Sequence, residues 1–401
     1  MWTCCSRPWT TCSDYCDAVL LTAIHTALRD AAREFAQSSI APYAQAWERA
    51  GTGVPESVLA QLAELGYFGM LVPAALGGSA LDMIGYALVT EEIAAADCGL
   101  CNLMNVSNSP VSAALCDYGS AVQHERFLRP LARGAMRGCF LLTESHAGSD
   151  AAAIRTRAER RGDRYVLNGA KHFVTAGSSA QLALIIAVTD AAAGKRGMTA
   201  FLAPTATPGY TVARLEDKLG HRNCDTAEIL LQDLELGSEH VLGTPGDGYR
   251  IALAYLEGGR IGVAAQAVGV ARAALTAAID YARVRTTFGA PIVEHQAVGF
   301  RLAEMATKVE AARQLTLHAA AMADAGEQAS VAAAMAKTYA SRIAEEVCSD
   351  AIQVHGGAGY TGAFAVEKYY RDARVLSIYE GTNDIQHLVI AREIARGWEP
   401  R

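Results

Sequence analysis

The spacing of apolar residues changes character twice along this chain, and this order constrains the fold more than any other feature. From Leu20 to Arg133 apolar residues recur every three or four positions, as in LLTAIHTALRDAAREFAQ, which predicts helices. From Ala153 to Leu236 short β-rich runs alternate with Gly, Pro and Asp, which predicts strands and turns. After the GTPGDG segment at Gly243–Gly248 the helical spacing returns.

An order of α, then β, then α does not match the alternating βαβ units of a doubly wound sheet, and it argues against a Rossmann fold. We predict a mainly α protein with a central β domain, in which Arg161–Arg164 (RGDR) forms a hairpin turn. The last third should be a helix bundle, because apolar residues there recur on one helical face: Val298, Leu302, Met305 and Val309. The predicted boundaries are an unassigned N-terminal extension at 1–18, a helical domain at 19–137, a β domain at 138–241 and a helical bundle at 242–401.

The composition fits a globular protein without a basic surface. Of 401 residues, 51% are hydrophobic and 19% charged, which is ample core material for folded domains. Acids outnumber bases by 42 to 35, so no overall positive field would recruit nucleic acid or an anionic membrane. We find no apolar stretch near the roughly 18 to 20 residues of a membrane span and no signal or transit peptide, and we expect a cytoplasmic protein.

The ten cysteines do not suggest a metal site. The pair Cys98 and Cys101 lacks a second pair to complete a tetrahedral set. Four others crowd the N-terminus without regular paired spacing or nearby histidines: Cys4, Cys5, Cys12 and Cys16. We therefore expect reduced thiols and no metal.

The segment LLTESHAGSD, Leu141 to Asp150, is polar where a core strand should begin. Its hydroxyl groups (Thr143, Ser149) and carboxylates (Glu144, Asp150) could form hydrogen bonds to a flat heteroaromatic ring or to a phosphopantetheine arm. An ordinary β turn explains the same residues equally well.

In NGAKHFVTAG, Asn168 to Gly177, an aromatic and a hydroxyl residue alternate along a predicted strand. Phe173 and Thr175 would therefore share a face, which suits a ring-binding wall. On this segment alone, a buried core phenylalanine is the more common interpretation.

Arg285 lies in YARVRTTFG, just before a helix break, where its guanidinium could hold a phosphate. A solvated arginine at a helix end is the common alternative. The glycine-rich QVHGGAGY, Gln353 to Tyr360, follows a helix rather than a strand, so it lacks the context of a phosphate-binding fingerprint.

Glu380 ends the apolar run VLSIY and precedes a Gly-Thr-Asn turn. Apolar surroundings disfavour the charged form of a carboxylate and raise its basicity, which suits a general base. A solvated turn residue is the alternative.

Taken in this order, these four segments resemble the acyl-CoA dehydrogenase family, and the likeness runs from about Leu20 to Arg396. The family fold is a helical domain, a β-barrel-like domain and a C-terminal four-helix bundle, with FAD between the last two. The resemblance implies these FAD contacts from the β domain: Phe140, Leu142, Thr143, Gly148, Ser149, Phe173 and Thr175. It implies that these residues bind the FAD of a neighbouring subunit: Arg285, Thr287, Phe288, Gln296, Gln353 and Gly357. Thr382 and Asp384 correspond to contacts with the ADP part.

A cofactor shared in this way implies a homodimer, usually doubled to a homotetramer. The base of the family lies either in the Y-E-G-T motif or directly before Arg260, where this chain has Gly259, so the resemblance points to Glu380. The implied substrate contacts are Ser149, Glu257, Arg260, Tyr379 and Gly381.

The resemblance implies that Glu380 removes the α-proton of an acyl-CoA while the β-hydride moves to flavin N5. Electrons would then pass to an electron-transfer flavoprotein. The GGRIGVAAQA segment looks most like short-chain and short-branched-chain members, and the acyl cavity would lie along the helix with Asn102, Leu103, Val106 and Ser109. No arginine on that helix would receive a distal carboxylate, which argues against a dicarboxylic substrate.

Three alternatives stay open: a substrate carried on acyl-carrier protein, a flavin oxidase or monooxygenase, and a nucleic-acid-binding relative without activity. The chain departs from the family pattern at the flavin wall, where Phe173 replaces the more common Trp and Ala176 a usual Asn. Ser145 replaces a frequent Pro, and Ala363 stands where an acid is usual.

Overall fold

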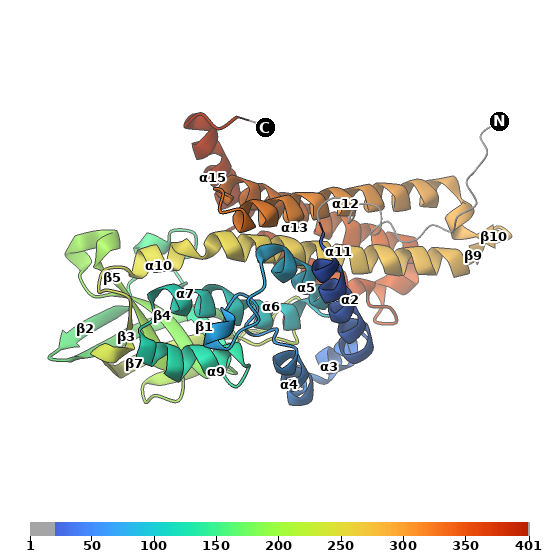
Figure 1. The fold of residues 1–401 in the computed structure, drawn as a ribbon. Coiled ribbons are helices and arrows are strands. Elements are labelled where there is room, and N and C mark those ends of the chain that lie inside the picture. The colour runs from blue at the N-terminus through green and yellow to red at the C-terminus, as the bar shows by residue number, and fades with distance from the viewer. Residues whose placement is uncertain (1–20, 400–401) are drawn as a thin grey trace.

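The computed structural model describes residues 21–399, with the side chains of Leu256 and Glu257 left aside. The extension 1–18 and its cysteines therefore lie outside the described residues. The helical, β and helical segments expected from the apolar spacing follow one another along the chain, and Figure 1 shows the β domain at one end of the long C-terminal helices. This confirms the mainly α fold with a central β domain.

The N-terminal segment is made of short helices around two buried ones. Thr22 caps the first helix by accepting a hydrogen bond from the His25 N–H, and His25, Arg29 and Ala32 form its buried stripe. The helices are α2 (Ala23–Phe35), α3 (Ala44–Ala50), α4 (Glu56–Glu64), α5 (Met83–Ala96), α6 (Cys98–Val106), α7 (Ala113–Tyr118), α8 (Ala121–Gln123) and α9 (Arg129–Ala132). A π-helical segment, Ser107–Ser112, follows α6.

The middle segment is an eight-stranded sheet in the order β6-β7-β3-β2-β4-β5-β8, with β1 parallel to β4. The strands are β1 (Gly138–Leu141), β2 (Arg157–Arg161), β3 (Arg164–Thr175), β4 (Leu182–Val188), β5 (Met198–Pro204), β6 (Tyr210–Leu215), β7 (Thr226–Gly237) and β8 (Val241–Leu242). The expected hairpin at Arg161–Arg164 joins β2 to β3, and its Gly162 has a φ of 65°. The runs RYVLNG and KHFVT form one strand, β3, with a register irregularity between Lys171 and Val174.

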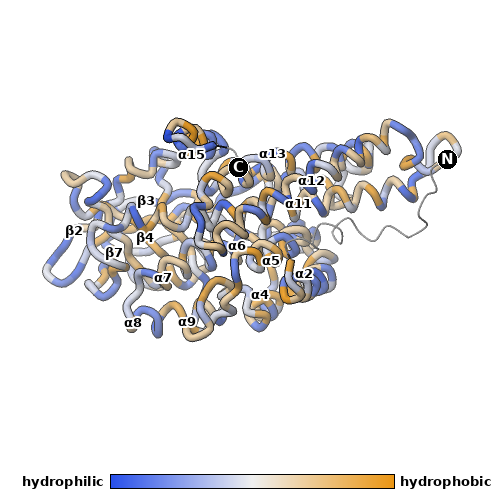
Figure 2. The backbone as a smooth tube through the Cα atoms, turned by 45° about the horizontal axis from the view of Figure 1, so that its top comes forward, coloured by the Kyte–Doolittle hydropathy of each residue, from blue (hydrophilic) through white to orange (hydrophobic). Residues whose placement is uncertain are grey.

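The C-terminal segment is built on three long helices that run side by side (Figure 1). The helices are α10 (Gly248–Ala254), α11 (Leu256–Val284), α12 (Gln296–Asp324), α13 (Ser330–His355), α14 (Val366–Ala373) and α15 (Asn383–Ala395). The short hairpin of β9 (Thr286–Thr287) and β10 (Ala290–Pro291) joins α11 to α12. As expected, Leu302, Met305 and Val309 are buried on one face of α12, and Figure 2 shows apolar and polar segments alternating along α12 and α13.

One stretch corrects the expectation that no apolar segment reaches the length of a membrane span. Gly248–Val284, which includes α11, is long and apolar enough by length and composition, with a mean hydropathy of 1.4 in its most apolar window. However, 78% of that window is buried inside the protein, as expected for the core helix of a bundle.

A buried cluster of charges joins the three segments. Lys368 of α14 lies 3.0 Å from the carboxylate of Asp97, which caps α6, and also pairs with Asp372. Asp372 accepts a hydrogen bond of 2.6 Å from the backbone N–H of His221 in the β domain, and Glu48 of α3 lies 3.6 Å from Lys368. Buried charges are costly unless they are paired in this way, so the cluster favours one arrangement of the three segments around this junction.

Candidate active site

Glu380 lies in a tight turn between the end of α14 and α15. Its φ is 53° and that of Gly381 is 84°, so both residues adopt the left-handed conformation. This conformation is uncommon for a residue with a side chain, costs about 1–3 kcal/mol, and concentrates at functional sites. Thr382 then caps α15 by accepting a hydrogen bond from the Ile385 N–H.

The carboxylate of Glu380 faces the first turn of α11. A Cβ atom built on Gly259 would stand 3.0 Å from Glu380 Oε2, so the absence of a side chain at Gly259 makes room for the carboxylate. Burial raises the pKa of Glu380, although the positive charges of Arg260 and Lys337 act against this rise. A carboxylate with a raised pKa is a stronger base than an exposed one.

Tyr379, next to the base, is anchored on both sides. Its hydroxyl donates a hydrogen bond to Gln266 Oε1 on α11, and the Gln266 amide donates to the Cys98 carbonyl at 2.8 Å. Its ring meets that of His221 edge to face, with centroids 5.9 Å apart. The turn is thereby tied to the junction of the three segments.

The residues predicted to form the flavin wall lie together in the β domain. Phe173 is 64% exposed and has a φ of 56°, so the interpretation as a core phenylalanine is wrong. The His172 N–H donates to the Thr143 carbonyl at 2.9 Å, which joins the Thr143 and Phe173 segments. Thr175 accepts a hydrogen bond of 3.4 Å from the Asn102 amide of α6. Gly148 and Ser149 are exposed in the adjoining loop, and Phe140 and Leu142 are half-buried.

Glu144 does not offer its carboxylate to a ligand, which corrects the possibility left open from sequence. The side chain is buried and accepts hydrogen bonds from the backbone N–H groups of Arg155 (2.7 Å) and Thr156 (2.9 Å). Lys171, which is fully buried, lies 2.8 Å from Glu144 and also donates to the Leu142 carbonyl at 2.9 Å. Burial lowers the pKa of Lys171 to about 8 against the opposing effect of Glu144. This ion pair, which sequence reasoning missed, supports the loop that carries Thr143 and Ser149.

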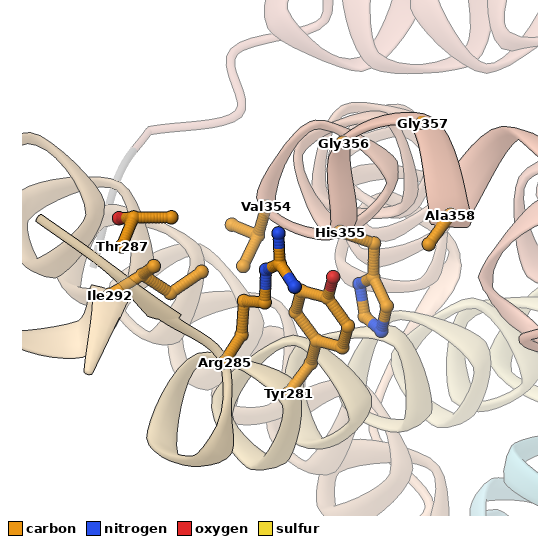
Figure 3. Close-up of a pocket in the computed structure, with 9 residues that line it drawn as sticks. All are labelled: Tyr281, Arg285, Thr287, Ile292, Val354, His355, Gly356, Gly357 and Ala358. Atoms are coloured by element: carbon orange, nitrogen blue, oxygen red, sulfur yellow. The ribbon is translucent and has the colours of Figure 1, made fainter. Parts of the chain in front are cut away.

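A cavity of about 390 Å³ lies at the far end of the bundle, where α11 and α13 end (Figure 3). Arg285, Thr287 and Gly357 line it together, as predicted. Tyr281 and His355 form one wall as stacked rings with centroids 4.3 Å apart. A guanidinium beside glycine backbone suits a phosphate, while the Thr287 hydroxyl pairs with the His295 ring at 2.9 Å.

Other residues of the predicted shared site do not line this cavity. Phe288 and Gln296 are exposed on the hairpin and at the start of α12, and Gln353 is exposed on α13. Asp384 is exposed in the first turn of α15, at the opposite end of the bundle (Figure 1). The side chain of Glu257 is outside the description.

The two groups of predicted cofactor residues do not form one site within one chain. Gly259 lies in the first turn of α11, beside Glu380, whereas Arg285 follows its last residue. Most of a 29-residue helix, about 43 Å long, separates them. The contact of the Arg285 group with a neighbouring subunit therefore stays a prediction.

The helix predicted to line the acyl cavity ends before Ser109. Asn102, Leu103 and Val106 belong to α6, but Ser109 has an extended conformation (φ −140°, ψ 122°) within the π-helical segment. Ser109 still faces the start of α11, because a Cβ built on Gly258 would stand 3.9 Å from its hydroxyl.

A helical domain, a β domain and a helical bundle that meet beside the turn of a half-buried glutamate form the three-part architecture expected of this class of flavin-dependent dehydrogenase. Models of the N-terminal, middle and C-terminal domains of acyl-CoA dehydrogenase match residues 22–135, 139–234 and 246–395. The chain belongs to the acyl-CoA dehydrogenase family. It is therefore an oxidoreductase of a family whose members depend on FAD.

Known relatives are similar over nearly the whole chain. The mitochondrial short-chain specific acyl-CoA dehydrogenase of Mus musculus is 40% identical over 392 residues, covering 98% of this chain and 95% of its own. Butyryl-CoA dehydrogenase from Megasphaera elsdenii has a TM-score of 0.91 and 38% identity, over 94% of this chain and 99% of its own. A chain from the structure of the electron transferring flavoprotein of Acidaminococcus fermentans has a TM-score of 0.92 and 40% identity, over 94% of this chain and 99% of its own.

Proposed function

We propose that this protein dehydrogenates a short acyl-CoA thioester to the trans-2-enoyl-CoA, with Glu380 as the base. The single observation that carries this proposal is the left-handed turn that holds a half-buried glutamate of raised pKa against Gly259. When bound, FAD supplies the acceptor for the β-hydride at its N5 atom. The residues of the chain position the thioester and move the proton.

Glu380 takes the α-proton and becomes a neutral carboxylic acid, while the electrons of that C–H bond form the new double bond. Within residues 21–399 the backbone N–H of Glu380 has no hydrogen-bond acceptor, so it can donate to the thioester oxygen as negative charge develops there. One such donor contributes about 3 to 4 kcal/mol to lowering a barrier. The base and this N–H belong to one residue, so the turn sets both at once.

The β-domain wall of Thr143, Phe173 and Thr175 would hold the flavin ring, and the cavity around Arg285 would hold the phosphates of a neighbouring subunit's FAD. The fit rests on the exposed aromatic ring of Phe173 and on the Arg285 guanidinium, which lies in one cavity with the glycine backbone of Gly356 and Gly357. This division requires at least a homodimer, and we propose a dimer or a dimer of dimers. Five further residues stay predictions as cofactor contacts: Thr382, Asp384, Phe288, Gln296 and Gln353.

The substrate contacts Ser149, Glu257, Arg260, Tyr379 and Gly381 also stay predictions. The short-chain names of the relatives support a short acyl group, and the likeness to a chain from the electron transferring flavoprotein structure supports that protein as the electron acceptor. A location in the cytoplasm remains our expectation. A nucleic-acid-binding role is less well supported, because the chain is acidic and keeps Glu380.

The test is an anaerobic titration of the purified holoenzyme with straight and branched acyl-CoAs, followed by the visible absorbance of the flavin. Bleaching by one or two short thioesters that is lost in Glu380→Gln is the expected result. Bleaching only by thioesters on acyl-carrier protein would instead establish a carrier-linked enzyme, and turnover with oxygen consumption an oxidase. A purified protein without flavin would refute the proposal.

A further inference from the structure

Lys337 is a fully buried lysine on α13 whose side-chain hydrogen bonds both lead to the turn of the base. Its Nζ donates one hydrogen bond to the Gly381 carbonyl and one to Asn383 Oδ1, both 2.9 Å long. Gly381 directly follows Glu380, and Asn383 is the first residue of α15. A single ammonium group thus holds the turn at two points beyond the base.

Lys337 differs from the buried lysines Lys171 and Lys368 in its hydrogen-bond partners. Lys171 lies 2.8 Å from Glu144, and Lys368 lies 3.0 Å from Asp97, so each has a carboxylate in direct contact. Among residues 21–399, no carboxylate lies within 4.0 Å of Lys337 Nζ. A buried ammonium without a paired carboxylate is costly, and such groups are concentrated at functional sites.

The charge of Lys337 is coupled to the base. Burial lowers the pKa of Lys337 to about 7, the Glu380 carboxylate acts to raise it, and Arg260 of α11 acts to lower it further. In return, Lys337 and Arg260 act to lower the pKa of Glu380. Tyr86 and Tyr379 also lie near Glu380, and their raised pKa values keep both hydroxyls neutral. Glu380 and Arg260 are therefore the charges to which Lys337 responds.

We propose that Lys337 is a positioning residue for the base. Its two hydrogen bonds hold the left-handed turn at Glu380 and Gly381, and its positive charge favours the ionised glutamate that can accept a proton. Because the inference rests on the proposed function of Glu380, its test must separate a wrong base from a wrong positioning residue.

Four variants of the holoenzyme make this separation. Lys337→Met removes the charge and both donors, Lys337→Gln keeps a donor without the charge, and Lys337→Arg keeps both. Ser341→Ala is the matched control, because Ser341 lies one turn further along α13 and bonds the same Asn383 side chain without a charge. Flavin content and thermal unfolding establish that each variant is folded.

The measurement is the rate of flavin bleaching by subsaturating butyryl-CoA as a function of pH. For Lys337→Met and Lys337→Gln we expect the acidic limb to move up by about one pH unit, a tenfold slower rate at a fixed pH below the limb. Lys337→Arg and Ser341→Ala should keep the limb of the wild type. If Lys337→Met does not retain flavin, Lys337→Gln decides the question.

Two results would overturn the proposal. A uniform loss of rate in Lys337→Gln with the limb unmoved would leave the lysine a purely structural role, and an unchanged profile would leave it no role in the reaction. A wrong base shows itself differently: no thioester bleaches the wild type, or Glu380→Gln is bleached as fast as the wild type. That outcome overturns both proposals.

Discussion

The ion pair between Lys171 and Glu144 allows a sharp prediction, because both groups are buried and each also holds backbone. In Lys171→Met, the Leu142 carbonyl loses its donor, and the Glu144 carboxylate keeps the N–H groups of Arg155 and Thr156 and the His146 ring 3.6 Å away. Removal of one partner of a buried pair leaves an uncompensated charge, which costs about 3–5 kcal/mol. We expect Lys171→Met to destabilise the protein by about 3 kcal/mol.

The double variant Lys171→Met/Glu144→Gln separates charge from packing. It removes the orphaned carboxylate and leaves an amide oxygen to accept from the backbone, so its loss should be smaller than the sum of the two single losses by about 1–3 kcal/mol. Lys308→Met is the control, since Lys308 pairs with Glu346 at the surface (2.8 Å), where such pairs contribute less than about 1 kcal/mol.

The assay is urea unfolding of the holoenzyme at one fixed protein concentration, followed by far-ultraviolet circular dichroism and by flavin release. Cofactor binding and assembly contribute to every transition, so the loss for each variant is taken as its shift in midpoint relative to the wild type, multiplied by the common slope m. Flavin should leave Lys171→Met before the helices unfold, because the pair supports the loop of Thr143 and Ser149. Additive losses, or a Lys171→Met midpoint equal to that of Lys308→Met, would refute the reasoning.

Three further outcomes are expected. The bleaching rate of the wild type should fall as pH drops through the raised pKa of Glu380. The acidic limb of its pH profile should therefore lie above 4.5, the ordinary pKa of a glutamate, and a limb at or below 4.5 would contradict a buried base. Gly262→Ala should lower the free energy of unfolding by about 1–3 kcal/mol, because its Cβ would meet the Tyr86 hydroxyl at 2.5 Å. Gly258→Ala on the same helix is the control: nothing lies closer than 3.8 Å to its Cβ, so the change should be neutral or stabilising. Thermal unfolding of the two variants is the measurement. Phe288→Ser should keep its circular dichroism but sediment as a smaller species with less flavin, because we expect the proposed dimer to cover this exposed ring on the hairpin beside Arg285. An unchanged sedimentation coefficient would place the interface elsewhere.

The fold could be predicted from sequence because it rests on local patterns. Periodicity alone predicted that Leu302, Met305 and Val309 share one buried face of a helix. The four residues RGDR predicted a hairpin, because so short a segment between two β-rich runs leaves room only for a tight turn, and it joins β2 to β3. Glu380 stood out because a lone carboxylate ended an apolar run.

The supports of the site could not be predicted in the same way. Lys337 and Lys171 look like ordinary lysines of a helix and a strand, and their burial depends on partners far away in the chain. The left-handed backbone at Phe173 and Glu380 is also set by tertiary packing, since residues with side chains do not prefer it locally. Ser109, which the resemblance places on the acyl helix, is extended for a local reason: it directly precedes Pro110, and a proline disfavours the helical conformation of the residue before it.

The length of α11 has a genetic consequence. With Glu380 at one end and Arg285 at the other, each proposed site draws its base from one chain and its phosphate-binding arginine from another. Arg285→Ala and Glu380→Gln chains should each be inactive alone, yet a mixed dimer holds one site with both native residues and one with neither. Co-expression should therefore restore activity through complementation between two defective alleles.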